Sequence, residues 1–371
     1  MPPVVTRILV LGTDHSPQLA VRSYEPARLR AYLLRLRPDA ICVEATPDAF
    51  ARGAIPDFIH EARHIALPFA AAHGIPVHPI DWVPPADDQR LAWGVPDLLE
   101  PPLVRLPGSY WDFLAFPDPT RVSQGLFFAE DPACAAEVDA WSDGSRRDGE
   151  RDFPRRLGLY RTFMQAMRVK AAAARHPGGT VLVVVGYMHK YDMEKVLKGA
   201  EGLSLVQPSA AGPPTDAETA AARTPEDDWA VATFNVLGQQ AHRGAVDWPW
   251  VDEVLARLPA GPESALLLAR RDVRKGLAGR ERFLALAAAA ASDRPFTFDG
   301  VADRRRLDSY FDPFGNLAVR QRALLESARE AGKAGETAAA EALRAQVAAG
   351  LTARQTVQLD AYWPLHVRNT P

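Results

Sequence analysis

The chain has 371 residues, of which 47% are hydrophobic and 24% charged, with 43 Lys and Arg against 46 Asp and Glu. This composition is typical of a folded protein, and the length predicts two domains of ordinary size. A net charge of −3 provides no basic surface for nucleic acid or an anionic membrane, so we expect neither partner. Because the sequence has no signal stretch and no apolar run long enough for a membrane span, we expect a cytoplasmic protein. The sequence carries no signal for its oligomeric state.

Strand-like and helix-like segments alternate over the first 82 residues. Residues 7–11 and 40–43 are short apolar runs, and residues 75–80 form an extended run whose prolines favour an edge strand. Between them, residues 26–36 and 57–73 carry apolar side chains at helical spacing. This βαβαβ order predicts an α/β fold with a mostly parallel sheet and helical crossovers.

The same alternation returns near the middle of the chain. Residues 157–175 have the apolar stripe of a helix, and residues 180–185 form the most apolar strand of the sequence. A short helix at 191–199 and a strand at 203–206 complete another βαβ unit. We therefore expect an α/β domain over residues 1–209.

Three other regions complete the predicted organisation. Residues 83–154 are rich in proline and aromatic residues and lack a regular pattern, which indicates an insertion that forms a lid or binding segment, carries short helices, or packs as an ordinary insertion. Residues 210–228, rich in Pro, Thr, Asp and Glu, predict a linker or long surface loop. Residues 229–371 are dense in helix-forming residues and predict a mainly helical C-terminal region.

Four side chains that can bind a metal or move a proton follow predicted strands. Glu44 ends the second strand and Asp81 the third, while His15 and His189 each end a Gly-x-x-His turn that follows a strand. Because the carboxyl ends of parallel strands meet at one edge of a sheet, we expect these side chains to lie close together. Asp81 alone is equally explained as the cap of a following helix. The sequence therefore predicts a functional site built on His15, Glu44 and His189.

Side chains near these four extend the predicted site. The helix at 157–175 turns Arg161, Gln165 and Arg168 to one face, so that two guanidinium groups point the same way. Arg161 is the arginine that we expect beside the reacting groups. The additional candidates are Asp14, His78, Asp81 and Arg168.

Four segments of the chain resemble a known family. The runs LVLGTDHS at Leu9–Ser16 and RPDAICVE at Arg37–Glu44 look like the opening of the TraB/PrgY/GumN family, which is related to the Tiki proteases. The resemblance continues, in the family's order, in YRTFMQAM at Tyr160–Met167 and VVVGYMH at Val183–His189. The wider superfamily includes erythromycin-esterase-like enzymes and haem-binding ChaN-like proteins, so the resemblance implies their fold more directly than any one reaction.

The resemblance implies a hydrolase that acts on an amide (peptide) or ester bond of a small molecule or peptide. As in Tiki-like members, His15, Glu44 and His189 would hold a divalent metal of the Mn, Co or Zn class that activates water. The alternative mechanism, that of erythromycin-esterase-like members, uses no metal. In it, His15 would take the proton of water and Glu44 would orient the imidazole. In both, Arg161 would stabilise the oxyanion or hold a substrate carboxylate. A further alternative is a non-catalytic module that binds haem or a peptide.

A second motif competes with these residues. His60, Glu61 and His64 form a literal H-E-x-x-H on a predicted helix, the pattern by which zinc proteases place two ligands one turn apart with Glu as the base. Arg63 within the motif and Pro68 just after it are unusual for such a helix. The motif therefore has two interpretations: a zinc-protease site, or a helix face that is only packed or solvated.

Overall fold

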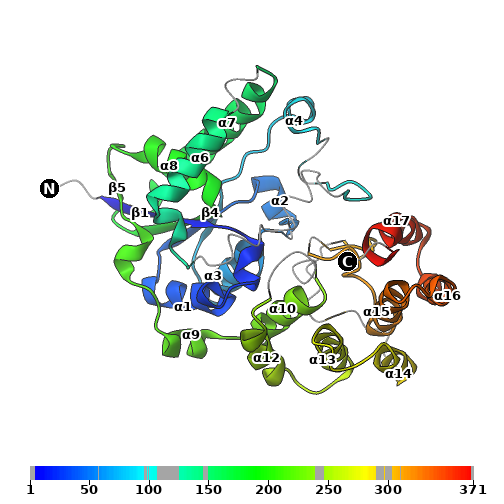
Figure 1. The fold of residues 1–371 in the computed structure, drawn as a ribbon. Coiled ribbons are helices and arrows are strands. Elements are labelled where there is room, and N and C mark those ends of the chain that lie inside the picture. Colours follow the sequence, from blue (N-terminus) through cyan, green and yellow to red (C-terminus); the bar gives the residue numbers. More distant parts are fainter. Residues whose placement is uncertain are drawn as a thin grey trace. The chain divides into compact units, whose positions relative to one another are not determined.

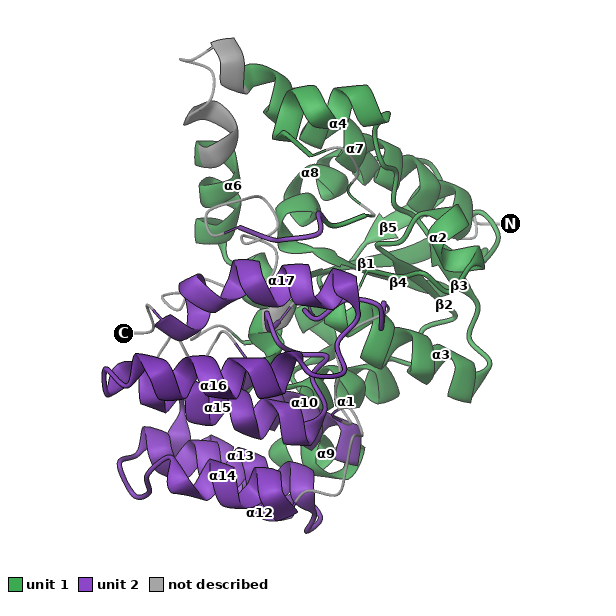
Figure 2. Cartoon of the chain, turned by 90° about the vertical axis from the view of Figure 1, so that its right-hand side faces the viewer, with its two compact units in different colours: residues 1–101, 123–223 green, residues 102–122, 224–371 purple. Residues whose placement is uncertain are grey.

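The computed structural model divides into two compact units, each described by itself (Figures 1 and 2). Unit 1 comprises Met1–Pro101 and Ser123–Arg223, and unit 2 comprises Pro102–Val122 and Thr224–Pro371. Within the part of the chain that the structure describes, no helix is long and apolar enough to cross a membrane. The described residues are 5–56, 58–95, 98, 100–106, 125–144, 149–238, 246–289, 296, 303–309 and 311–368.

A five-stranded, all-parallel sheet forms the centre of unit 1 and confirms the predicted α/β class. The strand order is β3-β2-β4-β1-β5, so the proline-containing β3 lies at an edge, as predicted. The long apolar strands β1 and β4 pair along their whole length in the interior. The strands are β1 (Thr6–Thr13), β2 (Ala40–Val43), β3 (Val77–Pro79), β4 (Thr180–Gly186) and β5 (Leu203–Leu205).

Helices cover both faces of this sheet (Figure 1). One face packs against α7 and α8, whose Val169 and Met193 are buried with Ile8 and Val183 of the central strands. The other face is covered by α1 and by the helix that ends in α3 (Figure 1). The α-helices of unit 1 are α1 (Pro26–Leu36), α2 (Pro47–Ala51), α3 (Leu67–His73), α4 (Ala86–Trp93), α6 (Pro132–Gly144), α7 (Gly149–Ala173), α8 (Tyr187–Leu197) and α9 (Asp216–Ala222).

Two predicted helices differ in detail from the observed ones. The helix expected at 57–73 contains a π-helical segment, η3 (Glu61–Ala66), in which the Leu67 N–H donates to the carbonyl of Ala62. The physical reason is Pro68, which has no N–H for the i→i−4 bond and so favours a wider turn before it. The short helix expected at 191–199 starts earlier, at Tyr187, so its first turn replaces the predicted Gly-x-x-His turn.

The predicted insertion and linker contain regular structure that their composition did not indicate. Residues 83–154 include α4, α6 and the first turns of α7, and the parts at 107–124 and 145–148 lie outside the described residues. The predicted linker at 210–228 contains α9, whose first turn is closed by a Thr215–Glu218 capping box. The boundary between the units falls after Arg223, inside the predicted linker.

Unit 2 is helical over most of its described residues, as the composition predicts. A glycine in the left-handed conformation follows two of its helices, Gly276 after the helix that ends at Arg274 and Gly335 after the helix that ends at Lys333. Its helices are α10 (Pro225–Val236), α12 (Trp248–Arg257), α13 (Pro262–Arg274), α14 (Glu281–Ala289), α15 (Val319–Lys333), α16 (Thr337–Ala348), α17 (Ala353–Trp363) and the π-helix η8 (Pro364–Arg368).

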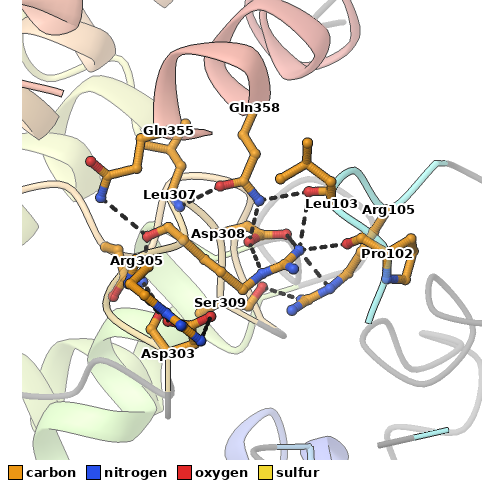
Figure 3. A network of polar contacts seen from close by, with 12 residues as sticks. Pro102, Leu103, Arg105, Asp303, Arg305, Leu307, Asp308, Ser309, Gln355 and Gln358 are labelled. Carbon is orange, nitrogen blue, oxygen red and sulfur yellow. Dashed lines mark hydrogen bonds and ion pairs between the residues drawn. The ribbon is translucent and has the colours of Figure 1, made fainter. Parts of the chain in front are cut away.

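A buried polar network ties residues of the predicted insertion into unit 2 (Figure 3). The Asp308 carboxylate accepts hydrogen bonds from Arg306 at 2.7 and 2.9 Å and from Gln358 at 2.8 Å. Arg306 and Gln358 in turn donate to the carbonyl of Leu103 at 3.1 and 2.7 Å. Because these bonds join a segment near residue 103 to α17 and the loop before α15, this part of the insertion belongs to unit 2.

Candidate active site

The carboxyl ends of β1, β2 and β4 bring the predicted residues together in unit 1. Thr13 at the end of β1 pairs with Gly186 at the end of β4, and β2 lies on the other side of β4. His15 follows β1 by two residues, Glu44 follows β2 directly, and His189 lies in the first turn of α8. The convergence follows from parallel strand topology, as the sequence predicts.

Glu44 is the carboxylate at the centre of the cluster. Its Oε2 accepts a hydrogen bond from the Gly186 N–H at 2.7 Å, and its Oε1 accepts one from Nη2 of Arg161 at 2.9 Å. Nε2 of His189 lies 3.5 Å from the same Oε1. Burial by itself would raise the pKa of Glu44, but His189, Arg161 and His15 together hold that pKa well below its usual range. Glu44 is therefore a carboxylate that carries its charge at any physiological pH.

Arg161 bridges Glu44 and Asp81. Its Nε donates to Asp81 Oδ1 at 2.8 Å and its Nη2 donates to Oδ2 at 2.9 Å, in a bidentate pair. Gln165, one turn further along α7, donates to Oδ1 at 2.8 Å, and Arg168 donates to the backbone carbonyl of Asp81. The helix face predicted to carry these three side chains thus holds Asp81. Arg161 therefore bonds two protein carboxylates in this structure.

His15 is fixed by a partner from η3. Its Nδ1 lies 2.7 Å from Oε1 of Glu61, and the Thr13 hydroxyl donates to the same oxygen at 2.8 Å. His15 itself has φ 51°, a left-handed conformation that is rare outside glycine and is commonest in functional sites. Burial would lower the pKa of His15, but the attraction of Glu61, with smaller ones from Glu44 and Asp14, raises it to about 9. At neutral pH this imidazole therefore holds two protons and donates Nδ1–H to Glu61.

His189 has a different environment. Its Nδ1 lies 2.7 Å from the hydroxyl of Thr162, which donates its own proton to the Gly158 carbonyl at 3.1 Å. The hydroxyl then accepts from His189, so the hydrogen-bond network places a proton on Nδ1. Nε2, the other ring nitrogen, lies 3.5 Å from Oε1 of Glu44.

Gly186 explains how the side chains from three strands approach so closely. A Cβ at this position would lie 3.1 Å from Nε2 of His15 and 3.3 Å from Oε2 of Glu44. Because Gly186 has φ −51°, the lack of space for a side chain, rather than an unusual backbone conformation, is what requires a glycine here. The same measurement shows that Nε2 of His15, the nitrogen not bound to Glu61, faces the Glu44 side of the cluster.

Glu61 is the functional side chain that sequence reasoning assigned to another site. It belongs to the H-E-x-x-H motif, but its carboxylate contacts His15 and Thr13. His60 and His64 stack on each other with ring centroids 4.8 Å apart. Burial, with the positive charge of His64 and Arg30, lowers the pKa of His60 well below its usual value. The motif's carboxylate is thus engaged by His15, which does not fit a zinc-protease base.

The additional candidates have other partners. His78 does not face Asp81: its Nε2 lies 2.8 Å from Nε2 of His176, and burial, His176 and Arg175 lower its pKa. The backbone N–H of Asp14 donates to the hydroxyl of Tyr24 at 3.4 Å. His78 is therefore a contact between the edge strand and the segment before β4, rather than a spare ligand of the cluster.

The donor set fits a divalent metal poorly. Among the described residues, no group of three or more His, Cys, Asp or Glu side chains has the arrangement of a metal site. A metal bound to Glu44 would lie beside the guanidinium of Arg161, which already bonds Oε1 at 2.9 Å. A metal at Nε2 of His15 would take the place of the second proton of the ring, while Nδ1–H stays on Glu61. Arg161 thus occupies the cationic position that the predicted metal would take.

Comparison with known proteins adds no relative. Searches of family models, curated proteins and solved structures found no match to this chain.

Proposed function

We propose that unit 1 is a hydrolase of ester or amide bonds in which two histidines act as base and acid without a metal. The observation that carries this proposal is the different partner of each imidazole: the carboxylate of Glu61 holds Nδ1 of His15, whereas the neutral hydroxyl of Thr162 holds Nδ1 of His189. Two imidazoles held by partners of different charge are suited to opposite roles as acid and base. This is the metal-free alternative of the family resemblance, with the roles of the histidines exchanged.

In the proposed reaction, Nε2 of His189 takes a proton from a water molecule as its oxygen attacks the substrate carbonyl. The imidazolium so formed lies 3.5 Å from Glu44, whose negative charge stabilises it. His15 then gives its Nε2 proton to the leaving oxygen or nitrogen as the C–O or C–N bond breaks. Return of the proton from His189 to His15, directly or through solvent, restores both groups, and the products are a carboxylic acid and an alcohol or amine.

Arg161 and Asp81 have a supporting role in this proposal. The guanidinium is held by Asp81 and Gln165 holds Asp81, so Glu44 has a fixed position and a permanent charge. Glu44 and Asp81 are paired with Arg161, and Glu61 is paired with protonated His15. A neutral carbonyl substrate therefore meets carboxylates that already have partners of opposite charge.

The test is hydrolysis of p-nitrophenyl acetate and of an amino-acid p-nitroanilide by the full chain. We expect His189→Ala and His15→Ala each to lower kcat/KM by about 100-fold or more, the usual contribution of an acid or base. His73→Ala, at the exposed end of α3, is the matched control and should retain full activity. Equal activity in all four proteins, or none in the wild type with either substrate, would contradict the proposal.

A further inference from the structure

Two aromatic side chains flank the Asp81–Arg161 ion pair. Trp82 follows Asp81 and Tyr160 precedes Arg161 in the chain, and their rings meet edge to face with centroids 5.1 Å apart. The Trp82 N–H donates to Asp81 Oδ1 at 2.9 Å, which fixes its backbone to the cluster. The ring pair is therefore anchored to residues that hold Glu44, rather than to a separate part of the surface.

The aromatic surface continues along α7. Tyr160 stacks on Phe163 with centroids 6.4 Å apart, and Met167 follows four residues later on the same helix face. Tyr160, Phe163 and Met167 are 51%, 43% and 40% exposed. Single exposed apolar residues are ordinary, but a contiguous row is typical of a surface that binds something apolar.

The sheet order places this row at one side of the proposed reaction centre. Trp82 follows the edge strand β3, which is the neighbour of β2, and β2 is the neighbour of β4. Neighbouring strands lie about 4.8 Å apart, so the end of β3 is about 5 Å from the strand carrying Glu44 and about 10 Å from that preceding His189. A substrate group that extends about 10 Å from the reacting carbonyl would reach the aromatic pair.

We propose that Trp82 and Tyr160 form a subsite for the apolar part of the substrate, an acyl chain of about six to eight carbons or an aromatic ring. This inference rests on the proposed hydrolase function and names its substrate class. Contact between aromatic rings and an apolar chain removes both from water, and the edge-to-face pair holds the rings in place before binding. Phe163 and Met167 extend the surface for longer groups.

The experiment compares p-nitrophenyl acetate, butanoate and octanoate with the full chain. We expect kcat/KM to rise by about 100-fold from acetate to octanoate, since each buried methylene favours binding. Tyr160→Ala and Trp82→Leu should remove most of this rise, measured within each protein as the ratio of kcat/KM for octanoate to kcat/KM for acetate. Phe153→Ala, also exposed on α7 but two turns before Tyr160, is the control and should keep the full rise.

A binding measurement separates this inference from the proposed function. Calorimetry with 2-octanone and acetone, which cannot be hydrolysed, reports the subsite without turnover. If the wild type hydrolyses no ester but binds 2-octanone, and Tyr160→Ala weakens that binding about 10-fold, the subsite stands and the hydrolase proposal fails. If hydrolysis depends on His189 but is independent of chain length in every variant, the subsite is wrong and the hydrolase proposal stands. Absence of both activities overturns both.

Discussion

Oε1 of Glu61 lies 2.7 Å from Nδ1 of His15, although 46 residues separate them in the chain. Glu61 is buried in η3, while His15 lies just beyond β1 in a left-handed backbone conformation. A buried carboxylate opposite an imidazole is stabilised when the imidazole is charged, and the pair then fixes both the tautomer and the orientation of the ring. The proton on Nε2 of His15 is thus a consequence of Glu61, and most of the proposed chemistry depends on it.

Replacement of Glu61 by Gln should change the pH profile of the reaction. In the wild type, the pKa of His15 at about 9 predicts that kcat is constant up to pH 8 and falls above pH 9, as the acid loses its proton. In Glu61→Gln the neutral amide cannot hold the proton, so the alkaline limb should move to near or below pH 6.5. An unchanged alkaline limb in the variant, measured from pH 5 to 10, would show that His15 is not the acid.

The same ion pair should appear in the stability of the protein. The pKa of folded His15 lies above the value of 6.5 for a free histidine, so its contribution is complete below pH 6.5 and is lost as the pH rises through about 9. The contribution is at most about 3 kcal/mol of unfolding free energy. Urea unfolding at pH 6 and pH 9.5 should show this decrease in the wild type and not in Glu61→Gln.

Gly186→Ala should remove activity without unfolding the protein. The new methyl group would meet His15 and Glu44 at 3.1 and 3.3 Å, so one of them must move, while the backbone at φ −51° accepts alanine. We expect kcat/KM to fall at least about 10-fold, with a change in unfolding free energy of about 1 kcal/mol or less. Gly158→Ala, where a Cβ meets no atom within 4 Å, is the control and should be fully active.

The strand-end residues of this cluster followed from topology, because parallel strands with glycine or acid at their carboxyl ends must converge. His15, Glu44, Asp81 and His189 needed no contact information for that inference. The face of α7 that holds Asp81 followed from helical spacing in the same way. These are regularities of secondary structure, and the sequence carries them locally.

Glu61 could not be assigned in this way. Glu61 begins a π-helical segment, in which the usual helical spacing does not apply, and its partner His15 lies 46 residues away in the chain. Pro68 was a visible signal that the helix is irregular, but it did not say which carboxylate meets His15. The sequence also did not predict the partner of His78. His176 lies 98 residues further along the chain, in a bend outside the strands and helices whose spacing could place it.

Arg161 should contribute mainly to stability and to the position of Glu44. Arg161→Ala would leave Glu44 and Asp81 buried without their guanidinium, and breaking such a pair typically costs about 3–5 kcal/mol of unfolding free energy. Arg161→Lys should retain only part of the unfolding free energy that Arg161→Ala loses, because an ammonium group cannot make the bidentate contact with Asp81. Arg156→Lys, in an exposed pair with Asp152, should be nearly neutral in the same urea unfolding experiment. A small loss in Arg161→Ala would contradict the bridging role.

In unit 2, Asp308→Asn tests whether the segment near Leu103 is part of its folded core. Asp308 accepts from Arg306, Gln358 and Tyr362, and the side chains of Arg306 and Gln358 hold the Leu103 carbonyl (Figure 3). We expect a loss of about 3 kcal/mol, together with faster hydrogen exchange at residues 102–106. Asp303→Asn is the control, because Arg305, the partner of Asp303 in an ion pair, is exposed to solvent. This variant should change neither the unfolding free energy nor the exchange rate by much. Protection of 102–106 that is unaffected by Asp308→Asn would separate that segment from the network.

Metal content distinguishes the present proposal from the metal-dependent mechanism that the motifs also suggest. Because Arg161 bonds Glu44 and Glu61 keeps a proton on His15, we expect less than about 0.1 equivalent of Mn, Co or Zn in protein purified without chelator. Incubation with each metal at pH 7 should leave the hydrolysis rate unchanged.

Near-stoichiometric metal that disappears in His15→Ala and His189→Ala would instead require a metal site in which Arg161 moves away from Glu44. Metal lost only in His60→Ala would assign it to the H-E-x-x-H helix. The protonation of His15 also predicts that any metal bound there binds more tightly as the pH rises through 9, which a titration with zinc at pH 7 and pH 9.5 would reveal.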